Sequence, residues 1–194
     1  MRAAAAPAGL RLRFVEEVAP GVVVVCPEVT RTIKLCTAFC VARRVVAPQW
    51  LRESVRTRAL QPLDGFTAPM ARALGERGLN SGKAWERRRL TGERAPGVLA
   101  AAPPVYVPVG TTQREDLRAL VAVMGGTVVA SLKDAKDAAR RGSGLAVVAS
   151  AEAAKEELGA LRGAKGVKLA HFYWITDAAL SQALQPLEAF PLDV

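Results

Sequence analysis

The chain contains Ala59-Leu60-Gln61-Pro62-Leu63-Asp64-Gly65-Phe66 and, 124 residues later, Ala183-Leu184-Gln185-Pro186-Leu187-Glu188-Ala189-Phe190. The same offset relates Trp50 to Trp174 and Val45 to Leu169. It also carries Val23-Val24 onto Val147-Val148, so no insertion is expected between these features. Separate features that agree at one fixed offset indicate that one structural unit occurs twice. The 194 residues have room for two such units of about 90 residues each.

The second unit carries signals for alternating strands and helices. Leu145-Ala146-Val147-Val148-Ala149 is a continuous apolar run, which is typical of a strand buried on both faces of a parallel sheet. The glycine pair Gly125-Gly126 marks the end of a preceding helix. We expect strands over residues 105–109, from 127, over 145–149 and over 167–170, and helices over 117–124, 153–161 and 175–184.

The first unit supplies fewer elements. We expect strands over residues 22–25 and 45–46 and helices over 29–42 and 50–59. The counterparts of residues 105–124 would fall before or at Met1, so this unit lacks its opening strand and helix, and residues 10–17 are expected to serve as an inner strand. The predicted fold class is α/β, with two units that each contain a small parallel sheet flanked by helices.

These patterns divide the chain into a first unit over residues 1–66, a basic linker over 67–104 with one helical piece, and a second unit over 105–194. The whole chain has a net charge of +9, which attracts polyanions such as nucleic acid or phosphorylated protein. Within the linker, Arg87, Arg88 and Arg89 are candidates for contacts with DNA, against the plainer interpretation of a solvated connector. The apolar runs are too short for a membrane helix. The chain is expected to be a monomer.

Catalytic chemistry finds little support in the sequence. His171 is the single histidine, whereas metal sites and acyl-transfer triads usually draw on several. Three cysteines without ligand spacing predict neither a metal site nor a disulfide framework, and they favour a reducing compartment. The loop from Gly78 to Ala84 imitates a phosphate-binding loop but has the wrong spacing and no hydroxyl after Lys83. We therefore expect a protein that is not an enzyme and uses no cofactor or metal.

One constellation favours anion binding. Arg31 and Lys34 lie three residues apart at the start of the first unit's helix, so both project from its first turns. The free N–H groups and the dipole of a helix N-terminus also favour an anion there. A guanidinium and an ammonium group added to such a terminus suit a phosphate group. The alternative is that both are ordinary exposed cations on an amphipathic helix.

The run Arg31-Thr32-Ile33-Lys34, followed by Val45-Val46-Ala47-Pro48-Gln49-Trp50-Leu51, resembles the second half of a BRCT repeat. The second unit is similar to a whole repeat through Gly125-Gly126, the apolar run that starts at Leu145, and Trp174. The resemblance covers nearly the whole chain apart from the linker and the first residues. It implies a tandem BRCT module, as found in nuclear scaffolds of the DNA damage response or of chromosome segregation.

By this resemblance the chain binds a phosphoserine or phosphothreonine peptide in the groove between its repeats. Lys34 and Thr32 would hold the phosphate, and Arg31 would grip the peptide backbone. Side chains from both units would line a pocket for a downstream residue of the peptide: Cys36, Thr111, Thr112, Phe172 and Tyr173. At the offset of 124, Lys155 and Leu158 stand in the places of Arg31 and Lys34, so only the first unit keeps the motif.

Two departures from the family pattern leave other functions open. The family's hydroxyl and glycine N–H ligands for the phosphate follow an opening strand that the first unit lacks. Phe172 also stands where the family often has a basic residue. Phosphate-independent protein docking, or DNA binding through the linker, are therefore the alternatives to phosphopeptide binding.

Overall fold

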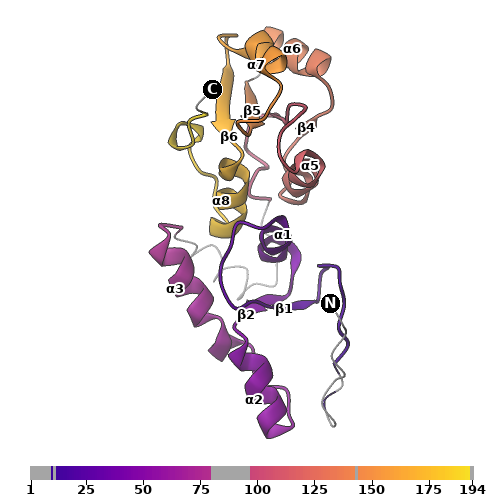
Figure 1. The fold of residues 1–194 in the computed structure, drawn as a ribbon, viewed down its shortest axis with the longest axis vertical. Helices are drawn as coiled ribbons and strands as arrows, with labels where there is room; N and C mark the ends of the chain where they lie inside the picture. Colours follow the sequence, from indigo (N-terminus) through magenta and orange to yellow (C-terminus); the bar gives the residue numbers. More distant parts are fainter. Residues whose placement is uncertain (1–9, 11, 80–96, 143, 193–194) are drawn as a thin grey trace.

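The computed structural model describes residues 10, 12–79, 97–142 and 144–192 (Figure 1). The first unit and the segment after it contain β1 (Val23–Val25), α1 (Ile33–Val41), β2 (Arg44–Val46), α2 (Gln49–Thr57), the short 3-10 helix η1 (Asp64–Phe66) and α3 (Ala68–Glu76). The second unit contains β3 (Val105–Tyr106), α5 (Arg114–Val123), β4 (Val128–Val129), α6 (Leu132–Arg141), β5 (Leu145–Ala149), α7 (Lys155–Leu161), β6 (Val167–His171), α8 (Tyr173–Ser181) and η2 (Leu187–Ala189).

Both sheets are parallel, as the sequence predicts. The second unit has four strands in the order β4-β3-β5-β6, and every residue of the central strand β5 is buried. The first unit has a two-stranded sheet of β1 and β2, paired with Val24 opposite Val45. Over the residues that the structure describes, the chain is therefore an α/β protein with a four-stranded and a two-stranded parallel sheet.

The two units end in the same hydrogen-bonded arrangement. The indole Nε1 of Trp50 donates to the carbonyl of Gln61 at 2.9 Å, and that of Trp174 donates to the carbonyl of Gln185 at 2.8 Å. The residue after each of these helices adopts the left-handed conformation, with φ of 53° in both units. A repeated octapeptide therefore corresponds to a repeated structure, and the offset of 124 holds from the tryptophan onward.

Strand pairing shows that the offset between the two units is 123, and not 124, at β1 and β5. Val24 pairs with Val45, whereas Val147 pairs with Leu169, which is the counterpart of Val45. Val24 therefore corresponds to Val147, an offset of 123, and not to Val148 as the ungapped comparison predicts. The sequence could not resolve this shift because four consecutive valines precede Cys26, and any register among them is equally apolar.

Helix α6 is absent from the sequence-based expectation, which places two strands in succession here. Its buried residues are the small side chains Ala135, Ala138 and Ala139, so the usual apolar helix pattern is weak. Its end signals are present nevertheless. Ser131 is the N-cap and accepts a hydrogen bond from the Asp134 amide, and Gly142 ends the helix in the left-handed conformation.

The inner strand expected over residues 10–17 is wrong. Residue 10 and residues 12–17 form neither strand nor helix, and a bend lies at Glu16 and Glu17. The segment from Leu12 to Val18 instead lines an open groove beside β1. Glu16 and Glu17 carry adjacent negative charges at the bend. A turn then follows, in which the Val22 amide donates a hydrogen bond to the Ala19 carbonyl, so the backbone is not extended immediately before β1.

Helix α1 joins the two units. It packs against α5 and α8 of the second unit, and Figure 1 shows it between the first sheet and those helices. Leu35, Cys36 and Phe39 from α1 belong to the same buried cluster as Leu117 and Trp174. Leu74 of α3 and Leu99, both from the segment expected to be a linker, are also buried in this cluster. One continuous core therefore runs through both units.

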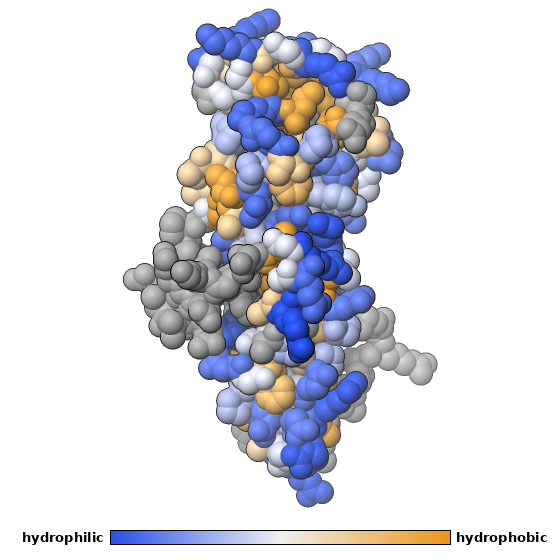
Figure 2. All heavy atoms as spheres, turned by 90° about the vertical axis from the view of Figure 1, so that its left-hand side faces the viewer, coloured by the Kyte–Doolittle hydropathy of each residue, from blue (hydrophilic) through white to orange (hydrophobic). Residues whose placement is uncertain are grey.

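The surface on the face shown in Figure 2 is mixed in character. Hydrophilic side chains cover most of both ends of the molecule, and hydrophobic ones show between them without forming one continuous area. Within the described ranges, no helix has the length and apolarity needed to cross a membrane. The described residues also contain no group of three or more His, Cys, Asp or Glu side chains placed to hold a metal ion.

Candidate functional site

The start of α1 presents a cation beside a helix N-terminus. Thr32 is the N-cap, and its hydroxyl accepts a hydrogen bond from the Leu35 amide at 3.4 Å. The Thr30 hydroxyl lies 3.4 Å from that of Thr32. Lys34, in the first turn, is exposed. The N-terminal N–H groups, the helix dipole and this ammonium group together favour an anion.

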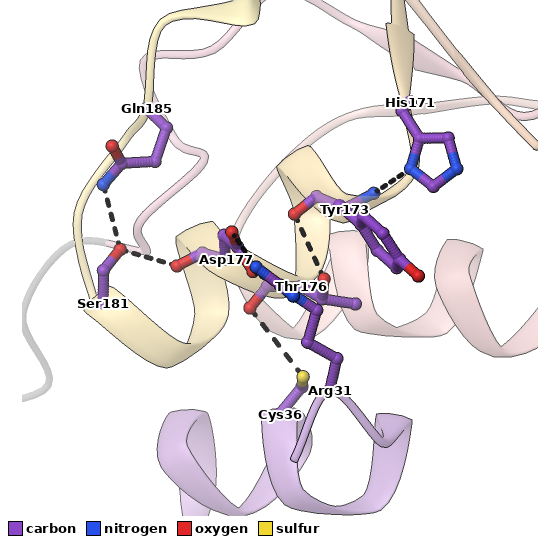
Figure 3. Close-up of polar contacts among 8 residues, drawn as sticks. All are labelled: Arg31, Cys36, His171, Tyr173, Thr176, Asp177, Ser181 and Gln185. Atoms are coloured by element: carbon purple, nitrogen blue, oxygen red, sulfur yellow. Dashed lines mark hydrogen bonds and ion pairs between the residues drawn. The ribbon is translucent and has the colours of Figure 1, made fainter. Parts of the chain in front are cut away.

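Arg31 joins this terminus to the second unit. Its Nε donates to Oδ1 of Asp177 at 2.6 Å and its Nη2 donates to Oδ2 at 2.9 Å, so the pair is bidentate (Figure 3). The Asp177 side chain is 6% exposed and that of Arg31 is 37% exposed. The guanidinium carbon also lies 4.8 Å from the centre of the Tyr173 ring. The hydrogen bond to Asp177 raises the pKa of Arg31 above its usual value.

Cys36 lies deeper at the same junction. Its side chain is completely buried, and its Sγ lies 3.8 Å from the Thr176 carbonyl of α8. Burial raises the pKa of this thiol to about 12, and the neighbouring Cys40 and Asp177 add to the effect. Cys36 is therefore a neutral side chain that packs between the two units.

The aromatic residues at the start of α8 form a cluster. The ring centres of Phe172 and Tyr173 lie 4.8 Å apart, and that of His171 lies 4.5 Å and 4.3 Å from them. The Tyr173 amide donates to Nδ1 of His171 at 3.2 Å, which holds the turn between β6 and α8. Tyr173 is 42% exposed and offers one ring face to Arg31.

The two threonines expected in the pocket lie in the loop between β3 and α5. The Thr112 amide donates to the Ser150 hydroxyl at 3.1 Å, and the Thr112 hydroxyl lies 3.1 Å from Oε2 of Glu152. Thr111 is buried, and its hydroxyl has no hydrogen-bond partner among the described residues. These contacts place the threonines at the carboxyl end of β5, where the Phe172 amide also bonds the Ala149 carbonyl.

The structure thus brings Arg31, Cys36 and Tyr173 together at the junction of the units, with Phe172 beside them and the threonines at the end of β5. Sequence reasoning missed Asp177 and Thr176, which complete the junction. The available signal was a carboxylate three residues after Trp174, on a helix whose other residues are nearly all buried. The linker arginines Arg87, Arg88 and Arg89 lie outside the described residues.

The second unit does not reproduce this site. Counted from the first residue of each helix, Ile33 in α1 corresponds to Lys155 in α7. The place of Lys34 is then taken by Glu156, and not by Leu158 as the fixed offset predicts. An acidic residue at this position opposes anion binding, so α7 does not repeat the position of Lys34.

Comparison with known proteins finds likeness in structure and not in sequence. No family model matches the chain, and no curated protein matches its sequence. The solved structures that match include the BRCT5-BRCT6 domains of Brc1 from S. pombe. That match has a TM-score of 0.57 and 18% identity, and it covers 84% of this chain and 79% of the other.

A second match is Rtt107p in its complex with a phosphorylated histone. Its TM-score is 0.58 at 7% identity, over 84% of this chain and 71% of the other. Two different tandem BRCT structures therefore match most of the chain, including both units. The protein described here has the tandem BRCT fold.

Proposed function

We propose that this chain is a tandem BRCT module that binds a phosphoserine or phosphothreonine peptide, as part of a nuclear scaffold in the DNA damage response or in chromosome segregation. The observation that carries the proposal is the cationic start of α1 at the junction of the two units. The phosphorylated histone in the Rtt107p complex supports the same class of ligand for this fold. The module acts by binding and performs no catalysis.

The phosphate would lie at the first turn of α1. Lys34 is exposed there, and the Thr32 hydroxyl caps the helix start by accepting a hydrogen bond from the Leu35 amide. A phosphate carries a charge of about −1.5 to −2 at neutral pH and accepts several hydrogen bonds. An ammonium group and the N–H groups of a helix N-terminus meet both requirements.

The peptide backbone would pass Arg31 toward the second unit. Asp177 uses the Nε and Nη2 donors of Arg31, which leaves Nη1 for a peptide carbonyl. Because the bidentate pair holds the guanidinium plane, less side-chain entropy is lost when the peptide binds. Beyond Arg31, the rings of Phe172 and Tyr173 and the side chain of Thr112 would receive a downstream residue of the peptide, and the buried Cys36 and Thr111 would support this pocket without touching the peptide.

The test is binding of an oriented library of phosphoserine peptides, with the same library unphosphorylated as its pair. We expect phosphorylated peptides to be retained, and Lys34→Glu to weaken them by about 10-fold to 150-fold, since one charged hydrogen bond contributes about 1.5–3 kcal/mol. Lys155→Glu is the matched control, because it places the same charge change at the exposed first turn of α7. Equal retention of both libraries would refute phosphate recognition.

Phosphate-independent docking is the second candidate. It is favoured by the structure of the first unit, in which no strand of the described residues precedes β1 to carry further phosphate ligands. This candidate predicts a partner whose affinity is unchanged by Arg31→Ala and Lys34→Ala. DNA binding through the linker arginines predicts instead an affinity that falls steeply with salt concentration.

A further inference from the structure

A second surface lies on the first unit beside β1, and it includes Lys34 of the proposed phosphate site. It is a groove of about 970 Å³ beside β1, hereafter the β1 groove. It is lined by residues 22–25 at β1, by the segment from Leu12 to Val18, by residues 60–64 and by the start of α2. Phe14 is 51% exposed, Leu60 is 55% exposed and Val25 is 37% exposed in this groove, so its lining is largely uncovered.

The edge of β1 that faces away from β2 has unused backbone groups. The Arg43 amide donates to the Val22 carbonyl at 2.8 Å, and the Cys26 amide donates to the Val46 carbonyl at 2.9 Å. Successive residues of a strand point their N–H and C=O groups to opposite edges. The groups of Val23 and Val25 therefore point to the other edge, along which no strand of the described residues lies.

The second unit shows what covers the equivalent edge. There β3 lies parallel to β5, with Val105 opposite Ala146, and the Ala146 amide donates to the Pro104 carbonyl at 2.9 Å. Ala146 is the counterpart of Val23, because they pair with the equivalent residues Lys168 and Arg44. With β3 in place β5 is entirely buried, whereas β1 is partly exposed along its length.

We propose that the β1 groove binds an extended apolar segment of a partner protein, flanked by acidic residues, as a strand added parallel to β1. The backbone of Val23 and Val25 supplies the hydrogen bonds, and the exposed apolar side chains of the groove supply the contacts. The groove lining includes four cationic side chains, Arg13, Lys34, Arg43 and Arg44, against three acidic ones, Glu16, Glu17 and Asp64. Together with the net charge of +9 this disfavours a second copy of the chain and favours acidic flanks.

The probe for this proposal is a peptide that copies residues 104–109 of the chain, with two aspartates added at each end and a fluorescent label. In the second unit this sequence already occupies the equivalent edge. We expect its fluorescence polarisation to rise on addition of the protein at concentrations below about 1 mM. Exchange of the aspartates for serines should weaken binding, and added salt should do the same.

N-methylation of the probe tests strand addition directly. In β3, Tyr106 faces β5, whereas the Val105 amide points the other way and donates to the Thr127 carbonyl. A methyl group on the amide at the Tyr106 position should therefore weaken binding by at least about ten-fold, because it removes a ladder hydrogen bond and adds bulk at the edge. A methyl group on the amide at the Val105 position should change affinity by less than about three-fold.

Protein variants test the place of binding. Leu60→Ser should lower the affinity for the probe by about five-fold. Leu60 is 55% exposed in the protein alone, and serine would remove the apolar contact that this side chain makes with the bound probe. Leu184→Ser is the matched control, since Leu184 is the repeat counterpart of Leu60, is 45% exposed, and belongs to the unit in which β3 occupies the corresponding sheet edge. Amide exchange at Val23 and Val25 should be faster than at Val24 in the protein alone and should slow when the probe binds.

Each other result overturns the proposal. Absence of binding at about 1 mM probe, or equal sensitivity to both N-methyl groups, excludes strand addition. Protection of the Val23 and Val25 amides without probe shows that the chain itself covers the edge. Dimerisation that Leu60→Ser abolishes assigns the groove to a second copy. Lys34 belongs to both the β1 groove and the proposed phosphate site, so the pair of N-methyl probes and Leu60→Ser, which leave Lys34 unchanged, distinguish strand addition from binding at the phosphate site.

Discussion

Replacement of Arg31 by methionine tests how the two units are held together. The variant keeps most of the apolar stem of the side chain and removes the cation from Asp177. In the structure this carboxylate is 6% exposed and receives two hydrogen bonds from the guanidinium group. Arg31→Met leaves it buried without its partner, which is the costly way to break an ion pair.

The expected loss is about 2 kcal/mol of unfolding free energy. Two charged hydrogen bonds at about 1.5–3 kcal/mol each set an upper limit, and the 37% exposure of Arg31 lowers this value because water screens the pair. A chain of this size should then melt about 4–8 °C lower. The measurement is calorimetry together with urea unfolding, where the midpoint should fall by about 1 M.

Arg56→Met is the matched control for this variant. Arg56 pairs with Glu53 at 2.8 Å, and Glu53 is the repeat counterpart of Asp177. Its side chain is 72% exposed, so this variant should change stability by less than about 0.5 kcal/mol. If Arg31→Met also stays within that limit, or if Arg31→Met costs as much in an Asp177→Asn background as in the original chain, the pair does not hold the units together.

Three further predictions concern other parts of the fold. Cys36, with a pKa raised to about 12, should be about 0.1% thiolate at pH 9, so iodoacetamide should modify the half-buried Cys26 first. Mass spectrometry after limited reaction checks the order, and early modification of Cys36 would contradict its burial. Glu157→Ala should cost about 2 kcal/mol in urea unfolding, because the Tyr106 hydroxyl, 2.7 Å from the carboxylate, loses its acceptor; a neutral result would exclude this role. Gly97→Ala should lower the melting temperature by at least about 4 °C, since a Cβ there would lie 2.1 Å from a backbone oxygen at the end of α5. An unchanged melting temperature would refute this close packing.

Much of the fold could be predicted from the sequence because the closing segment occurs twice. Trp50 and Trp174 differ in their neighbours, yet each donates to the glutamine carbonyl eleven residues later. The continuous apolar run at Leu145 also indicated a central parallel strand, which the structure confirms. Patterns of this kind depend on contacts that are local in the sequence, so a reader of the sequence can recognise them.

The remaining features depend on packing between distant segments. Helix α6 buries alanines, whose small side chains carry little periodic signal. At the candidate site, the sequence pattern predicts Arg31 in the first turns of a helix, whereas Arg31 lies two residues before α1 begins, and its partner Asp177 is 146 residues away in the sequence. Which carboxylate meets Arg31 is decided by how α8 crosses α1, and no local pattern contains that information.

The shared core around α1 has a consequence for how such a chain can be divided. Its repeats are units of sequence, but Leu35, Cys36 and Phe39 are covered by residues of the other half. A fragment that ends after the first repeat would expose this apolar face to water and would invite proteases and aggregation. The first repeat therefore depends on the second for the cover of its central helix, whereas the second repeat also has a buried cluster of its own around Tyr106 and Leu145.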